Sequence, residues 1–153
     1  MTEFRSRMGI VGNMYLQLFD TEGRLKDERL IRNTVTELMD AQVADRMSDQ
    51  GDAAIGYMAV GTGLGQGAAS TGLAVSLDRN ALDSTTQGAG GADNDVVYVA
   101  SWAAGDGTGA ITDAGILTGD NDTSLQYYGD FDVINKGAAD SLVITWTATF
   151  GAS

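Results

Sequence analysis

Three residue types are missing from this 153-residue chain, and each absence removes a class of chemistry. Without Cys there can be no disulfide, no thiolate nucleophile and no Cys-ligated zinc. Without His the chain lacks the commonest general base and the commonest metal ligand of proteins. Pro is absent as well, so the turns must be built from Gly, Asn and Asp, and Gly occurs 21 times.

Basic residues are scarce, with 9 Lys and Arg against 21 Asp and Glu, for a net charge of −12. Nucleic acids and anionic membrane surfaces both require cationic partners, so we expect the protein to bind neither. The sequence has no run of 18 apolar residues, the length needed to span a bilayer. Gly and polar residues interrupt the apolar stretch at 8–19, so we do not expect a signal peptide there. We therefore expect a protein that is made in a cytoplasm and stays there or is assembled into a particle.

The front of the chain predicts a β-hairpin followed by a helix. Two strand-like segments within residues 13–32 flank the turn D-T-E-G at 20–23. Asp at the first position and Gly at the fourth are favoured in a type I turn. Thr34 and Glu37 have the spacing of a capping box, which predicts a helix over about residues 35–48. Apolar residues recur every four positions and form one stripe on this helix, which we interpret as core: Val35, Met39, Val43 and Met47.

From residue 55 onward the pattern is that of strands. Runs with β-type alternation lie at 55–60, 73–77, 95–103, 111–117, 124–134 and 142–150, whereas the polar stretch at 78–94 is typical of an exposed loop. In the last strand Trp146 alternates with threonines and is expected to face inward with Leu142, Ile144 and Phe150. The prediction is a mainly β fold with one helix, a β-sandwich or partly closed barrel of antiparallel strands. It forms a single domain over 13–153, preceded by an arm at 1–12.

Motifs that suggest chemistry are weak. The Gly-rich stretch at 61–68 is not followed by a helix, so we interpret it as a flexible surface loop and not as a nucleotide site. The D-N-D clusters at 93–95 and 120–122 lack the Gly and Glu of a calcium loop. A Ser or Thr nucleophile in residues 48–153 would have only Lys136 as its base. We therefore predict no enzyme activity, no cofactor and no metal.

Two surfaces are candidates for contact with other molecules. Trp102, Tyr127 and Tyr128 suggest a platform for sugars, because adjacent tyrosines in a strand point to opposite faces and one should be exposed. The arm mixes apolar and basic side chains that could bind a capsid protein or a neighbouring subunit. The predicted contact residues are Phe4, Arg5, Arg7, Met8, Ile10 and Val11.

Four segments, taken in order, resemble structural proteins of tailed-bacteriophage virions. The turn at 20–23 followed by R-N-T-V-T at 32–36 is similar to the family's D-x-x-G turn and N-x-[VI]-T helix start. A-V-G-T-G at 59–63 and I-T-D-A-G-I-L at 111–117 resemble its A-V-G-T-G turn and I-T-E-A-G-L-F strand. The end, from Lys136 to Trp146, resembles K-x-x-x-D-x-L-x-I-x-W. The family's T-A-P loop is absent from residues 64–70.

The resemblance implies a capsid decoration, or cement, protein on the outside of the head. Its partners would be the major capsid protein and copies of itself in a homo-oligomer such as a trimer. It would be synthesised in the host cytoplasm and located on the virion exterior. Two alternatives stay open: a tail, neck or fibre component of the virion, and a carbohydrate-binding attachment module.

Overall fold

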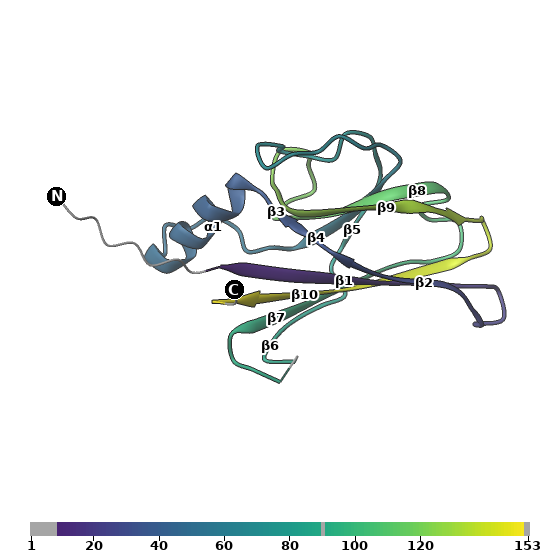
Figure 1. The fold of residues 1–153 in the computed structure, drawn as a ribbon, viewed down its shortest axis with the longest axis horizontal. Helices are drawn as coiled ribbons and strands as arrows, with labels where there is room; N and C mark the ends of the chain where they lie inside the picture. The colour runs from purple at the N-terminus through teal and green to yellow at the C-terminus, as the bar shows by residue number, and fades with distance from the viewer. Residues whose placement is uncertain (1–8, 90, 152–153) are drawn as a thin grey trace.

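Two antiparallel sheets of five strands pack face to face in the computed structural model, which describes residues 9–89 and 91–151 (Figure 1). Sheet A contains, in spatial order, β2 (Leu25–Arg32), β1 (Ile10–Phe19), β10 (Ser141–Phe150), β7 (Asp95–Trp102) and β6 (Ser84–Gln87). Sheet B contains β3 (Thr34–Val35), β9 (Leu125–Lys136), β8 (Gly109–Leu117), β4 (Tyr57–Gly61) and β5 (Ser76–Ala81). The predicted β class with one helix is confirmed, and the form is a sandwich.

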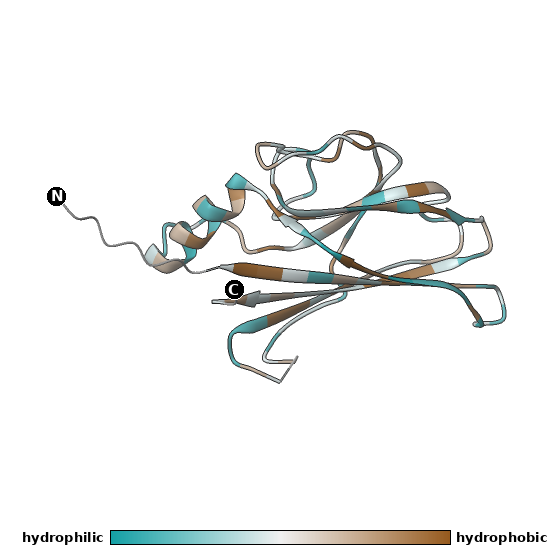
Figure 2. Ribbon diagram, viewed as in Figure 1, coloured by the Kyte–Doolittle hydropathy of each residue, from teal (hydrophilic) through white to brown (hydrophobic). Residues whose placement is uncertain are grey.

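The inner faces of both sheets share one hydrophobic core. Trp146 is fully buried there with Leu142 and Ile144, as the alternation in β10 predicts, whereas Phe150 is only partly buried at the end of the strand. The Trp146 ring lies 6.3 Å from that of Tyr127, which lies 6.5 Å from that of Tyr98, so aromatic contacts join β10, β9 and β7. Figure 2 shows hydrophobic and hydrophilic residues interspersed along β1 and α1 (Glu37–Ser48), each of which has one buried face.

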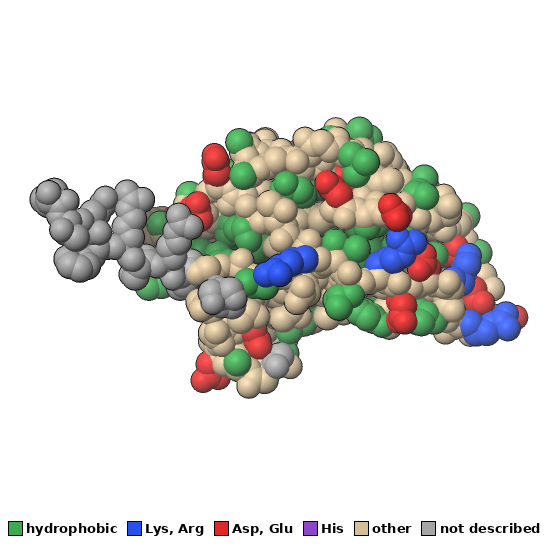
Figure 3. All heavy atoms as spheres, viewed as in Figure 1, with side chains coloured by type: hydrophobic (Ala, Val, Ile, Leu, Met, Phe, Trp, Pro, Cys, Tyr) green, Lys and Arg blue, Asp and Glu red, His purple; other side chains and the backbone are tan. Residues whose placement is uncertain are grey.

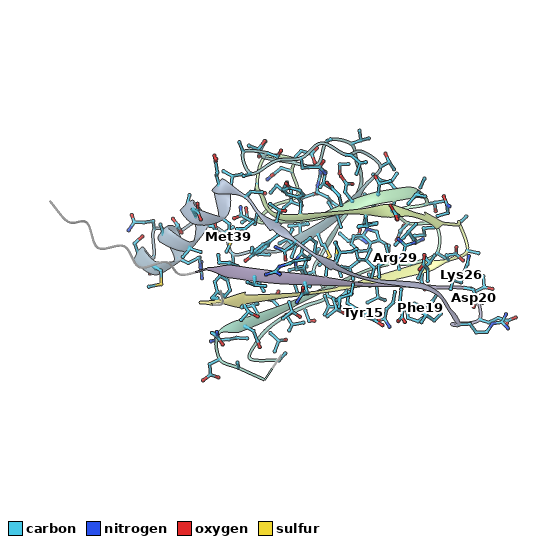
Figure 4. The ribbon with its side chains drawn as sticks, viewed as in Figure 1. Tyr15, Phe19, Asp20, Lys26, Arg29 and Met39 are labelled. Carbon is cyan, nitrogen blue, oxygen red and sulfur yellow. The ribbon has the colours of Figure 1, made fainter. Side chains whose placement is uncertain are left out.

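The predicted hairpin is confirmed, and it forms the end of the sandwich away from α1, called here the hairpin end. Asp20 organises its turn, because its carboxylate accepts hydrogen bonds from the amides of Glu22 and Arg24, both at 2.9 Å. The amide of Gly23, which has a φ of 77°, donates to the carbonyl of Asp20 at 3.0 Å. Figure 4 shows Asp20 and Lys26 at this end.

The chain crosses from sheet A to sheet B at Asn33. The Asn33 side chain turns into the core, where its Oδ1 accepts a hydrogen bond from Trp146 Nε1 at 2.8 Å. Gly12 makes room for it, since a Cβ at position 12 would overlap the Asn33 carboxamide. Thr36 then fixes the chain to sheet B, because its Oγ1 donates to the carbonyl of Leu125 at 2.5 Å.

The start of the helix differs from the prediction. Thr34 and Val35 pair with β9, and α1 begins at Glu37 with Thr36 as its N-cap residue, so the predicted capping box does not form. The Thr36 side chain makes no capping hydrogen bond, and its hydroxyl points to β9, where it donates to the carbonyl of Leu125. The apolar stripe is core only in part: Met39 is buried, but the side chain of Met47 is 84% exposed.

Two strand predictions around residues 73–94 were wrong. Residues 73–75 do not belong to a strand, and pairing with β4 begins at Ser76. The stretch expected to be a loop contains most of β5 and all of β6, which pairs with β7 as the edge strand of sheet A. The polar composition misled the prediction, because every residue of β6 is exposed.

Residues 62–75 run across the outer face of sheet B, and the predicted loop at 61–68 lies at the surface, with residues 62–68 outside regular secondary structure and mostly exposed. Leu73 packs there in a second core with Leu117, Leu125 and Tyr128. Gly115 provides the space, because a Cβ at that position would overlap the Leu125 side chain and crowd that of Leu73. The segment therefore covers this part of sheet B through Leu73 while most of its own residues remain exposed.

Candidate functional site: a groove at the helical end

An apolar groove of about 580 Å³ opens where α1 meets the end of sheet A, the region called here the helical end. The helix supplies one wall, the segment before β4 supplies another, and β6, β7 and β10 supply the floor. The lining residues are Met39, Gln42, Val43, Arg46, Met47, Ala54, Ile55, Thr85, Gln87, Val96, Tyr98 and Phe150.

The helix wall is held in place by hydrogen bonds to the segment that follows it. Gln42, almost fully buried, donates from Nε2 to the carbonyl of Ala53 at 2.9 Å. The amide of Asp52 donates to Asp45 Oδ1 at 3.0 Å, while Asp49 ends the helix with a left-handed φ of 52°. These contacts fold the chain back beside α1 and leave Met47 at the mouth of the groove.

The groove suits apolar ligands and offers little for acid–base chemistry. Its floor includes the ring of Tyr98, and burial raises the pKa of the Tyr98 hydroxyl to about 12, so it stays protonated near neutral pH. Arg46 is the one charged residue that lines the groove within the described part of the chain. Such a lining binds aliphatic or aromatic side chains through hydrophobic contact.

The predicted contact residues divide into two groups. Ile10 and Val11 belong to β1, where Ile10 pairs with Phe150, so the arm predicted over residues 1–12 extends too far. Its glycines misled the prediction: Gly12 is required inside the sheet by the Asn33 side chain. Phe4, Arg5, Arg7 and Met8 lie outside the described residues.

A buried carboxyl group that the sequence did not single out lies beneath the covering segment on sheet B. Asp113 of β8 is fully buried, and Gln66 Nε2 donates a hydrogen bond to its Oδ2. Burial raises the pKa of Asp113 to about 6, with a smaller contribution from the nearby charge of Asp130, although the Gln66 hydrogen bond acts in the opposite direction. Gly61 leaves room for this carboxyl, because a Cβ there would overlap Asp113 Oδ1.

The other polar motifs have structural roles. Asp120 and Asp122 form ion pairs with Arg79 at 3.0 and 2.6 Å, which attach the β8–β9 connection to β5. Lys136 is buried, its Nζ donates to the carbonyl of Ala103 at 3.0 Å, and burial lowers the pKa of this amine. Within residues 9–89 and 91–151, no group of three or more acidic residues is arranged to hold a metal ion.

No helix in the described part of the chain has the length and apolar character needed to cross a membrane.

The predicted aromatic platform does not exist. Tyr127 is fully buried in the core between the sheets, and Tyr128 is 8% exposed beneath residues 62–75. The two tyrosines point to opposite faces, as expected, but both faces of sheet B are covered. Trp102 is fully buried as well.

Residues from the four motifs that resemble phage virion proteins contact one another in two pairs. Asn33, from the segment at 32–36, is hydrogen-bonded to Trp146, from the last motif. Gly61, from the A-V-G-T-G segment, lies opposite Asp113, from the I-T-D-A-G-I-L segment, in neighbouring strands. Within the last motif, Asp140 accepts a hydrogen bond from the amide of Gly137 at 2.8 Å and so closes the β9–β10 turn. These motif residues build the fold.

Comparisons with protein-family models, with curated proteins and with solved structures found no match to this chain.

Proposed function

We propose that this protein is a structural component of a tailed-phage virion, a decoration protein that binds the outside of the head and stabilises it. It has no catalytic role in this proposal. Its partners are the major capsid protein and further copies of itself, and its place is the exterior of the particle.

The observation that carries the proposal is the pairing of the four family-like motifs. Each motif is weak as a string of letters, but Asn33 meets Trp146 and Gly61 meets Asp113 across large separations in sequence. These matches coincide with residues that make the sheet crossing and the covered outer face. This supports a resemblance that extends over the whole domain.

The charge of the chain is compatible with an exterior position. Residues 48–153 contain 13 acidic residues and two basic ones, Arg79 and Lys136, and Lys136 is buried. Packaged DNA would repel such a surface, whereas a protein on the outside of the head has no phosphates to meet.

We propose that the helical end faces the capsid and that the groove takes up an apolar segment of the major capsid protein. Met47 is exposed at the mouth of the groove, and Phe150 in its floor pairs with Ile10 at the start of β1. Phe4, Arg5, Arg7 and Met8, which the sequence predicts to contact the capsid or a neighbouring subunit, lie outside the described residues.

The test is binding of the purified protein to heads stripped of it. Met47→Glu should weaken binding by at least about tenfold, because it places a carboxylate against the apolar segment. The matched control is Leu64→Glu, which makes the same charge change at a residue that is 62% exposed in the segment covering sheet B. A shortened chain should begin at Gly9, so that β1 keeps Ile10, and it should bind more weakly than the whole chain.

Copy number distinguishes a head protein from a tail component. Hundreds of copies per particle support decoration, and a handful would overturn it in favour of a tail, neck or fibre role. Equal binding by Met47→Glu, Leu64→Glu and the unchanged protein would overturn the assignment of the groove.

A further inference from the structure

The outer face of sheet A is free of charge across four of its strands. The side chains that point away from sheet B on β1, β10, β7 and β6 are polar, aliphatic or aromatic, and apart from Asp95 at the rim none is ionic. They are half-buried or exposed, and Figure 4 shows Tyr15 and Phe19 on this side of β1. The residues of the face are Val11, Asn13, Tyr15, Gln17, Phe19, Ser84, Thr86, Val97, Val99, Ser101, Val143, Thr145, Thr147 and Thr149.

Charge returns at two edges of this face: next to β6, where the exposed Asp83 carboxylate accepts a hydrogen bond from Ser101 Oγ at 2.7 Å, and at β2. The strand register places Leu30, 69% exposed, at the end of a central row that runs through Tyr15, Thr145, Val99 and Ser84.

The neighbouring rows on either side of this central row begin at β2 with opposite charges. One row starts at Arg32 and continues through Asn13 and Thr147, and the other starts at Glu28 and continues through Gln17 and Val143. Figure 3 shows basic side chains along β2 and the hairpin, with acidic ones close by.

We infer that this face binds a second copy of the chain about a twofold axis along the central row. Such an axis, between two sheets packed face to face, lays the Arg32 row of one copy over the Glu28 row of the other. Each Arg32 then faces Glu28 of the partner subunit, and Leu30 faces Leu30 of the partner subunit near the axis. The face is therefore complementary to itself, as a twofold interface must be.

Area and charge both favour this occupant. The five strands hold 40 residues, which at about 3.4 Å per residue and about 4.8 Å between strands present roughly 650 Å² on each copy, and the pair exceeds the roughly 1,000 Å² of a specific interface. Copies that carry −12 each repel one another, and the repulsion is smallest where the facing surfaces carry no net charge.

Sedimentation of the whole protein over a concentration series tests the inference without any capsid. The unchanged protein should dimerise, and Thr145→Arg should weaken the dimer by at least about tenfold, because it buries two positive charges, one from each copy, opposite each other near the axis. Asn135→Arg, at an exposed position of β9, is the matched control and should leave the dimer unchanged.

A charge swap keeps the test decisive if Thr145→Arg fails to fold. Arg32→Glu and Glu28→Arg should each weaken the dimer by about tenfold, and the double variant should restore it to within about threefold. A monomer at concentrations up to about 1 mM, or a double variant no better than the single ones, would overturn the inference. Capsid binding by a monomeric variant would leave the proposed function intact.

Discussion

The outer face of sheet B is covered by another segment of the chain, whereas the outer face of sheet A is open, although both sheets consist of antiparallel strands on one shared core. Residues 62–75 cover sheet B, where Leu125 and Leu117 are buried on the side away from the core. On sheet A the corresponding side chains, such as Thr145 and Val99, stay half-buried. A strand pattern therefore identifies which residues share a face, but it does not reveal whether a distant segment will cover that face.

Small residues account for part of this difference. Gly61 and Gly115 lie on the covered face of sheet B, and a Cβ at either would overlap a neighbouring side chain. The open face of sheet A has β-branched Thr and Val in its central strands, which are favourable on a half-exposed pleated surface. A covering segment can approach the first surface closely, whereas the second is already filled by its own side chains.

The largest effect is expected in the core that both sheets share. Trp146→Ala should lower the free energy of unfolding by about 3–5 kcal/mol, because it leaves a large cavity and deprives Asn33 of its hydrogen-bond donor. Chemical denaturation measures the loss. A loss below about 1 kcal/mol would mean that the inner layer relaxes around the cavity and does not set the stability of the fold.

A matched pair of substitutions tests the contrast between the outer faces directly. Leu125→Ala, beneath residues 62–75, should cost about 2–5 kcal/mol, as for a fully buried leucine. Val99→Ala, on the open face of sheet A, should cost no more than about 1 kcal/mol at protein concentrations too low for self-association. Similar losses for the two variants would show that the outer face of sheet A is as well packed as that of sheet B.

The covered face should also impose its own dependence on pH. Because the pKa of Asp113 is raised to about 6, the folded state holds a proton that the unfolded chain loses near pH 4, so this group favours folding at low pH and its contribution is lost as the pH rises through 6. Asp113→Asn cannot ionise. The stability of this variant minus that of the unchanged protein should therefore grow by about 2–3 kcal/mol between pH 4 and pH 8.

Urea denaturation at several pH values measures that difference, and taking the difference removes the contributions of other groups. The pKa of Asp140, for example, is lowered, chiefly by the hydrogen bond from Lys26, so its stabilisation is lost as the pH falls. A difference that stays constant with pH would mean that water reaches Asp113 and that residues 62–75 do not seal the face.

Local pattern was sufficient for the hairpin and for β7 to β10. Asp20 and Gly23 specify their turn through contacts within five residues, and the alternation around Trp146 places that residue inside. The same reasoning missed β6, which is polar on both sides because it is an edge strand that pairs with β7 through its backbone. It also misplaced the start of α1, because the hydroxyl of Thr36 bonds to Leu125, far away in sequence.

The candidate site was the least predictable part. The stripe of α1 indicated which residues point inward, but whether Met47 is core or the mouth of a groove depends on where β6, β7 and β10 end beneath the helix.

The sequence by itself determined the hairpin, β7 to β10, the class of fold and an acidic chain poor in reactive groups, because alternation, turn residues and charge are properties of neighbours along the chain. Only the tertiary structure decided that Tyr128 is covered, that the carboxyl of Asp113 is buried and that sheet A keeps an open outer face. Those outcomes depend on which distant segments come to lie on a strand, and no local pattern records them.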